Sequence, residues 1–123
     1  MISQQEREVL RRLAAEWAAW ADKPIQQERI RLWKALNGLR PERPMVWITE
    51  IPWGELRDHP DLALQCTTKR ARQVEAAMRE RLFTQKYLTV DEVLPPYYLV
   101  RKRVLNAGYG VEVEEERLEQ GES

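Results

Sequence analysis

The chain has 123 residues, which is enough for one domain with a hydrophobic core. Its content of 43% hydrophobic and 33% charged residues is typical of a globular protein rather than a disordered one. The 20 basic and 20 acidic side chains cancel, so the chain lacks the basic excess on which dedicated nucleic-acid-binding proteins depend. Zero net charge also gives little repulsion between copies, which favours association.

Three features bear on the cellular compartment. Cys66 is the single cysteine, so no intrachain disulfide can form, as is typical of a reducing compartment. The first residues are charged and lack the apolar stretch of a signal peptide. No apolar run approaches the roughly 20 residues needed to cross a bilayer. We therefore expect a cytoplasmic protein with no membrane partner.

Two helices are expected in the first 37 residues. Ser3 and Glu6 have the spacing of a capping box, in which the two side chains satisfy free main-chain amides at the start of a helix. Pro24 ends the first helix, because the residue before a proline disfavours the α conformation. A second helix is predicted from about 26 to 37, with Gly38 in the left-handed conformation after it. The short link predicts an antiparallel helical hairpin.

A strand and a third helix are expected next. Met45 to Ile48 is a short run with β-branched residues between prolines, which is typical of a buried strand. A longer amphipathic helix is predicted from about Thr68 to Tyr87. Its apolar stripe contains Ala71, Val74, Met78 and Leu82.

The C-terminal part predicts a β-hairpin. A strand over Tyr97 to Leu105 leads through a glycine-rich turn at 106–110 into a partner strand at 111–113. The predicted fold class is therefore α+β, with the helical hairpin and the third helix packed on a small sheet. We expect one domain over residues 1–118, followed by a frayed acidic tail at 119–123.

The residue types used for catalysis and metal binding are scarce. His59 and Cys66 are one histidine and one cysteine, whereas a zinc site needs about four ligands, or three and a water. No third residue is evident that would orient a Cys–His nucleophilic pair. Gly108 and Gly110 precede an acidic, strand-like stretch rather than the helix that a phosphate-binding loop requires. We therefore expect no catalytic residue, no metal site and no cofactor in this chain.

The third predicted helix is locally basic, and its cations could form a stripe that binds phosphate groups. Acidic residues interleave with them, however, and the Glu75–Arg79 spacing supports an ordinary ion pair within a helix. A solvated charged face is therefore favoured, and we expect no nucleic-acid partner. The cations are Lys69, Arg70, Arg72, Arg79, Arg81 and Lys86.

Five tryptophans are the most unusual feature of the composition. Trp47 and Trp53 flank Glu50, and a carboxylate beside two indoles could bind a ligand, with the rings giving shape and the acid orientation. The same three residues could instead form a strand end packed under the helices. The sequence therefore gives Trp47, Glu50 and Trp53 as candidate ligand-binding residues, with packing as the alternative.

The stretch from Leu32 to Leu56, LWKALNGLRPERPMVWITEIPWGEL, resembles the N-terminal region of the uroporphyrinogen decarboxylase-like proteins. That superfamily also contains corrinoid-dependent methyltransferases. The similarity spans roughly residues 25–116, and the RPMVWITEIPW motif is its most specific part.

The resemblance implies a (β/α)₈ barrel that lies C-terminal to this region. Catalytic groups of such barrels come from the loops that follow the strands, and a whole barrel takes roughly 250 residues. The barrel is therefore expected to be absent here, together with the zinc ligands of the methyltransferase members. Corrinoid or zinc would belong to the full-length family member.

Two functions stay open at this point. In the first, the chain is the N-terminal segment of a uroporphyrinogen decarboxylase-like protein linked to corrinoid-dependent methyl transfer, and it supports a C-terminal barrel. In the second, it is a stand-alone cytoplasmic protein-interaction module that forms a dimer. The partner is accordingly the barrel or a second copy of the chain.

Overall fold

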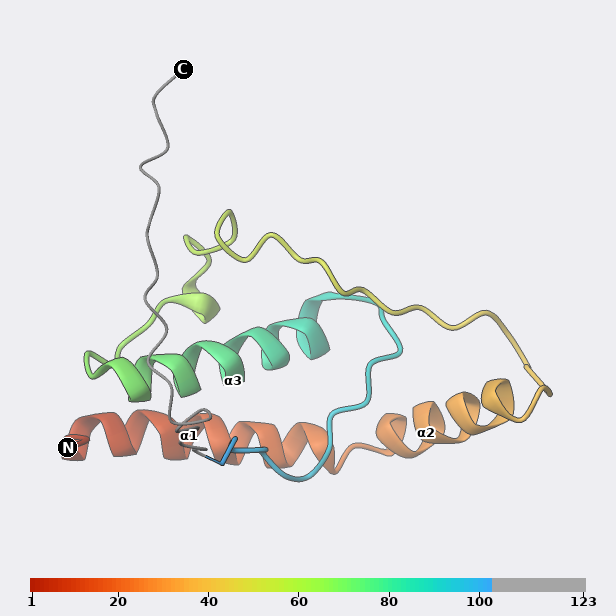
Figure 1. The fold of residues 1–123 in the computed structure, drawn as a ribbon, viewed down its shortest axis with the longest axis horizontal. Helices are drawn as coiled ribbons and strands as arrows, with labels where there is room; N and C mark the ends of the chain where they lie inside the picture. Colours follow the sequence, from red (N-terminus) through yellow and green to blue (C-terminus); the bar gives the residue numbers. More distant parts are fainter. Residues whose placement is uncertain (103–123) are drawn as a thin grey trace, which may run out of the picture.

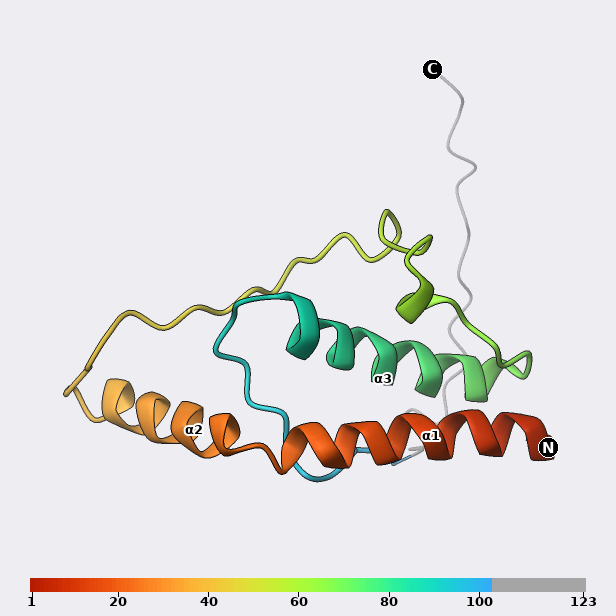
Figure 2. The ribbon, with the colours of Figure 1, turned by 180° about the vertical axis from the view of Figure 1, so that it is seen from behind.

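The computed structural model describes residues 1–102, and this part of the chain is helical (Figure 1). Two long helices lie side by side, and a third continues beyond the end of the first (Figures 1 and 2). Among these residues no helix has both the length and the apolar character needed to cross a bilayer. The elements in chain order are α1 (Gln4–Ala21), α2 (Pro24–Asn37), the short 3₁₀ helix η1 (Pro60–Leu62) and α3 (Lys69–Tyr87).

Helix α1 begins as the sequence predicts. The Ser3 side chain accepts a hydrogen bond from the Glu6 amide at 3.2 Å, and the Glu6 carboxylate accepts one from the Ser3 amide at 2.9 Å. The capping box is therefore confirmed. The predicted apolar face is also confirmed at its centre, where Val9, Leu13 and Trp17 are buried.

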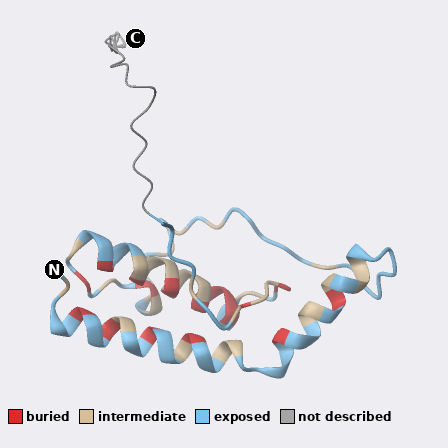
Figure 3. Ribbon diagram, turned by 60° about the horizontal axis from the view of Figure 1, so that its bottom comes forward, coloured by how far each residue is buried: buried red, intermediate tan, exposed pale blue. Residues whose placement is uncertain are grey.

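Helices α1 and α3 run in the same direction. Their first turns meet, because Glu6 near the start of α1 accepts hydrogen bonds from Thr68 at the start of α3. Further along both helices, Glu16 of α1 forms an ion pair with Lys86 in the last turn of α3. Figure 3 shows the buried residues on the faces that these helices turn toward each other. The core cluster consists of Val9, Leu13, Trp17, Cys66, Ala71, Met78, Leu82 and Leu94.

The predicted antiparallel hairpin of the first two helices is wrong. Helix α2 points away from the end of α1 in both opposite views (Figures 1 and 2). The physical reason is that α3 already covers the apolar face of α1, so α2 instead contacts the segment that follows α3, where its buried Gln26 accepts a hydrogen bond from the Leu94 amide. Helix α2 starts at Pro24, two positions before the predicted start, because a proline is well tolerated in the first turn of a helix.

The end of α2 differs from the prediction by one residue. Gly38 has a φ of −83°, and the left-handed conformation instead falls on Leu39, with a φ of 59°. The Arg40 amide bonds the Ala35 carbonyl at 2.9 Å, which is the long hydrogen bond of a Schellman motif. This non-glycine residue therefore holds a conformation that costs free energy, offset in part by the motif's hydrogen bonds.

The predicted α+β fold class is wrong for the described residues, because residues 1–102 contain no strand and no sheet. Met45–Ile48 lies in an irregular, open stretch, and Val46, Trp47 and Ile48 are 46%, 59% and 45% exposed rather than buried. Residues 97–102 are irregular as well. The β-branched composition of such segments is suited to a strand, but a strand also needs a neighbour with which to exchange hydrogen bonds.

The remaining predictions lie outside the described residues. These are the end of the strand at 103–105, the glycine-rich turn at 106–110, the partner strand at 111–113 and the acidic tail at 119–123.

Candidate functional site

A groove of about 420 Å³ lies over one side of α3. Its floor includes Ala77, Arg81 and Thr84 of that helix. One wall belongs to residues 48–53 and the other to residues 95–99, the two irregular segments that precede and follow α3. The groove is thus bordered by the chain that follows the first predicted strand, from its last residue Ile48 onward, and by the start of the second predicted strand.

Aromatic contacts position both walls. The Trp53 ring meets Phe83 of α3 edge to face, with centroids 5.9 Å apart. On the other side Trp17 of α1 meets Tyr98 at 5.8 Å, and its indole N–H donates to the Pro95 carbonyl at 2.7 Å. Such edge-to-face pairs contribute roughly 0.5–1.5 kcal/mol beyond their buried area. The walls are therefore attached to the helices by specific contacts.

Each charged side chain that lines the groove takes part in an ion pair. The Arg81 Nε lies 3.2 Å from a carboxylate oxygen of Glu92, and Glu80 pairs with Arg57 at 2.9 Å. Burial raises the pKa of Glu92, and the nearby guanidinium of Arg81 opposes that shift. Arg81 Nε and Glu92 Oε2 have no hydrogen-bond partner within residues 1–102, so the Arg81–Glu92 contact is an ion pair without hydrogen-bond geometry. The groove consequently offers paired charges and apolar walls.

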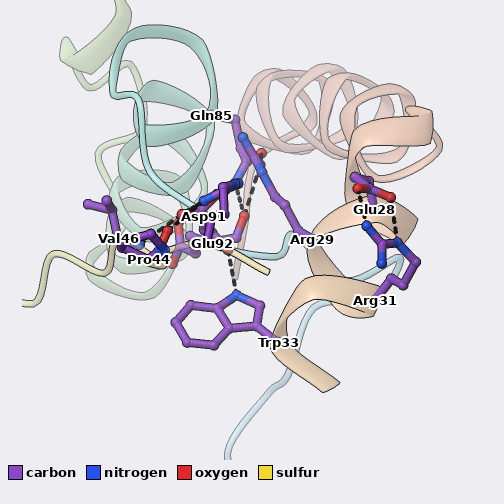
Figure 4. A network of polar contacts seen from close by, with 10 residues as sticks. Glu28, Arg29, Arg31, Trp33, Pro44, Val46, Gln85, Asp91 and Glu92 are labelled. Atoms are coloured by element: carbon purple, nitrogen blue, oxygen red, sulfur yellow. Dashed lines mark hydrogen bonds and ion pairs between the residues drawn. The ribbon is translucent and has the colours of Figure 1, made fainter. Parts of the chain in front are cut away.

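A polar network fixes the start of the first wall (Figure 4). The Asp91 carboxylate accepts two hydrogen bonds from the Arg43 guanidinium, at 2.7 and 3.0 Å, and a third from the Val46 amide at 2.8 Å. The Asp91 amide donates back to the Val46 carbonyl at 2.9 Å. The Arg43 hydrogen bonds, together with the one from Val46, lower the pKa of Asp91 to about 2. Asp91 is therefore charged at neutral pH and holds the chain at Val46.

The same network fixes the segment that leads to the second wall (Figure 4). The buried Gln26 donates to Gln85 at 3.0 Å and accepts from the Leu94 amide at 2.8 Å. Arg29 donates to Gln85 at 2.7 Å and to the Glu92 carbonyl at 2.9 Å. Helix α2 therefore contributes its polar side chains to hold the chain that returns from α3.

The three predicted ligand-binding residues are not brought together. Trp53 lines the groove, whereas Trp47 meets Trp33 of α2 edge to face at 6.0 Å. Glu50 is exposed and is not among the groove residues. Sequence reasoning missed Arg81 as a groove residue, because its spacing on α3 is that of an ordinary helix cation. Ligand binding at the predicted residues stays a prediction.

The contacts of His59 and Cys66 are those of residues that stabilise the fold. The His59 Nδ1 accepts from the Asp61 amide at 3.1 Å, and its ring stacks edge to face on Phe83 at 5.0 Å. Cys66 is buried in the core, and burial together with the Glu75 carboxylate raises the pKa of its thiol to about 11. Within the described part of the chain, no group of three or more His, Cys, Asp and Glu side chains is arranged to hold a metal ion.

Most of the cations on α3 contact protein groups. Arg72 donates to the Cys66 carbonyl at 2.9 Å, Arg79 pairs with the buried Glu75 at 2.8 Å, and Lys86 pairs with Glu16. The expected Glu75–Arg79 ion pair is present, but it is buried rather than part of a solvated face. The chain matches no family model, no curated protein and no solved structure. The candidate site therefore depends on the geometry of the described residues.

Proposed function

We propose that this chain is the N-terminal segment of a uroporphyrinogen decarboxylase-like protein, and that it supports a C-terminal barrel by packing against it. The observation that carries the proposal is the apolar surface left exposed on the two segments that border the groove. This surface, called the apolar rim below, consists of Val46, Trp47, Ile48, Tyr97, Leu99 and Val100.

Exposed apolar side chains gathered on adjoining segments mark an interaction surface more often than scattered single residues do. Removing apolar area from water stabilises a complex by about 25 cal/mol per Å² before the costs of association. Trp47 and Ile48 also belong to the RPMVWITEIPW motif that carries the resemblance. The proposal therefore places the most specific part of the resemblance at the surface that needs a partner.

In this function the chain has a supporting role and the barrel carries the chemistry. Corrinoid or zinc, and the groups that decarboxylate a substrate or move a methyl group, are assigned to the barrel. The alternative function, a stand-alone dimeric module, uses the same apolar rim to join two copies. Both functions require the rim to be buried in the working assembly, and they differ in what buries it.

The test is to titrate the purified chain with a (β/α)₈ barrel domain of a uroporphyrinogen decarboxylase-like protein that lacks its own N-terminal region. We expect binding by calorimetry, and we expect Ile48→Asp to weaken it at least about tenfold. The control is Ile25→Asp, because Ile25 has a similar exposure of 43% but lies in α2, outside the two segments that form the rim. Absence of binding to the barrel would contradict the proposal.

The stand-alone module is tested in the same samples. It predicts self-association of the chain in analytical ultracentrifugation at micromolar concentration, abolished by Ile48→Asp and unaffected by the barrel. Self-association that the barrel dissolves would instead support the enzyme segment, because both partners would then compete for one surface.

A further inference from the structure

We propose that the acidic sequence at residues 112–116 binds, within the same chain, to a cationic hollow beside the start of α3. The cationic hollow is defined by Lys69 and Arg70 of α3 and by Arg101 of the irregular segment that follows this helix. This inference goes beyond the proposed function, and it involves no barrel.

The first argument is the uneven distribution of charge along the chain. Residues 1–102 hold 18 of the 20 basic side chains but only 14 of the 20 acidic ones, so this part has a net charge of +4. Residues 103–123 hold the other 2 basic and 6 acidic side chains, and their net charge is −4. The zero net charge of the chain is therefore the sum of a basic part and an acidic part, which attract each other.

The second argument is that the cations of the hollow lack acidic partners. The hollow has a volume of about 490 Å³, and its described lining contains three cations and no acidic side chain. Lys69, Arg70 and Arg101 are exposed, and none of them forms an ion pair within residues 1–102. Arg79 and Lys86, further along the same helix, are both ion-paired. Like charges that lie together repel one another, so an anion placed among them is stabilising.

The third argument is the position of two of these cations. Lys69 and Arg70 are in the first turn of α3, which contains no acidic residue, and the Thr68 side chain does not cap the helix. The positive end of a helix dipole favours acidic side chains and disfavours cations. The Glu6 carboxylate that reaches this end is buried and already accepts from three main-chain amides. A further carboxylate beside the two cations would therefore be stabilising.

The fourth argument is that the acidic sequence has the right charge and lies within reach. Residues 112–116 read Glu-Val-Glu-Glu-Glu, which gives four carboxylates for three cations. Arg101 lies 11 positions before Glu112, and a chain of that length spans at most about 40 Å. A connection this short gives the two groups a roughly millimolar effective concentration. Single surface ion pairs are weak, but several can form here without the cost of bringing two molecules together.

An anion from another molecule, such as a nucleic-acid phosphate, is the competing occupant of the hollow. Residues 103–123 balance the charge of residues 1–102, so little net attraction remains for an outside polyanion. The distribution of charge therefore favours the chain's own acidic sequence.

The test treats the full chain with a water-soluble carbodiimide, which joins a carboxylate to a lysine amine that it contacts. Proteolysis and mass spectrometry then locate the crosslinks. Lys69 is the lysine of the hollow, and Lys34 of α2 is the control, because both are exposed and neither is ion-paired within the described part of the chain. The ion pair between Glu16 and Lys86 is the positive control. We expect crosslinks from residues 112–116 to Lys69 and few to Lys34.

Two charge-reversal variants separate attraction from mere proximity. The first, Arg70→Glu with Arg101→Glu, removes two cations of the hollow and keeps Lys69. The second, Arg11→Glu with Arg40→Glu, makes the same change in net charge at two exposed arginines that do not line the hollow. We expect the first to lower the yield of Lys69 crosslinks at least about fivefold, and the second to leave it within about twofold. Sodium chloride at about 1 M should lower the yield as well, because it shortens the Debye length to about 3 Å.

Crosslinks to Lys69 that are absent, or that form equally in the parent chain and the first variant, would overturn the inference. A mixture of isotope-labelled and unlabelled chains shows whether the contact is internal. If labelled peptides join unlabelled ones as often as they join each other, the acidic sequence binds a second copy, and the intramolecular assignment is overturned. No barrel takes part in these measurements, so their failure leaves the proposed function untouched.

Discussion

Replacing Glu75 by glutamine tests whether one buried carboxylate holds α3 to the loop before it. Glu75 has 0% exposure, and it accepts from the amides of Gln65 at 2.9 Å and Cys66 at 2.8 Å and from the Arg79 guanidinium at 2.8 Å. A carboxamide keeps one acceptor oxygen, so its NH₂ group must face one of these donors. A buried donor left unpaired costs about 1–3 kcal/mol, and a lost charge-assisted bond about 1.5–3 kcal/mol. We therefore expect Glu75→Gln to lower the free energy of unfolding by about 3–5 kcal/mol.

The assay is urea unfolding at pH 7, followed by tryptophan fluorescence. The control is Glu80→Gln on the same helix, because Glu80 pairs with Arg57 near the surface, with side chains 24% and 39% exposed. Such a pair is worth about 0–1 kcal/mol. A loss below about 1 kcal/mol for Glu75→Gln, or a loss equal to that of the control, would refute the reasoning.

The pH dependence gives a second check on Glu75. Burial raises the pKa of this carboxyl, but the hydrogen bonds from Cys66, Gln65 and Arg79 outweigh it, so the pKa lies below its ordinary value. The stabilisation is therefore present above the pKa of the unfolded chain, and it is lost as the pH falls through the folded pKa. The glutamine variant should show a shallower loss of stability in acid than the parent chain.

Three further perturbations test other polar contacts. Main-chain hydrogen bonds hold the pKa of Glu6 at about 2, and the Arg43 guanidinium does the same for the pKa of Asp91. The urea concentration at the unfolding midpoint should therefore decrease as the pH is lowered from 4.5 to 2 and both groups protonate. An unchanged midpoint would contradict this. Burial raises the pKa of the Cys66 thiol to about 11, so iodoacetamide at pH 8 should label it only after unfolding, as mass spectrometry would show. Gln26→Ala leaves the buried Leu94 amide without its acceptor and should cost about 2–4 kcal/mol in urea unfolding, and a cost below about 0.5 kcal/mol would show that this bond is dispensable.

The helices were predictable because their signals are local. Ser3 and Glu6 are three residues apart, and the apolar face containing Val9, Leu13 and Trp17 repeats within a few turns. A capping box and a helical stripe need no information about the rest of the chain. The start of α1 and the extent of α3 were therefore predicted to within about one residue.

The pairing of the elements was not predictable, because it depends on contacts between distant positions. Glu6 accepts from the amides of Thr67 and Thr68, more than 60 positions away, in addition to its role in the capping box. Nothing in the spacing of Ser3 and Glu6 distinguishes a carboxylate with one role from one with two. The predicted hairpin failed for the same reason, since proximity in sequence favoured α2 over α3 as the neighbour of α1.

The predicted strand at Met45–Ile48 illustrates a different limit. Its β-branched residues describe a segment suited to a sheet, but they do not supply the neighbouring strand. The candidate site was found only in part for a related reason. Trp53 was evident as an unusual aromatic residue, whereas Tyr98 and Arg81 enter the groove through the path of the chain around α3.

The parallel pairing of α1 with α3 also determines when the protein can fold during its synthesis. The contacts that hold α1 join it to positions far along the chain, as in the hydrogen bond between Trp17 and Pro95, 78 residues apart. At about 5–20 residues per second, the ribosome needs roughly 4–16 s to add that many residues. During this interval α1 can form as a helix, but its apolar face has no partner. In a nascent chain of this protein the apolar face of α1 therefore stays open to water and to other apolar surfaces until α3 and the segment after it have been synthesised.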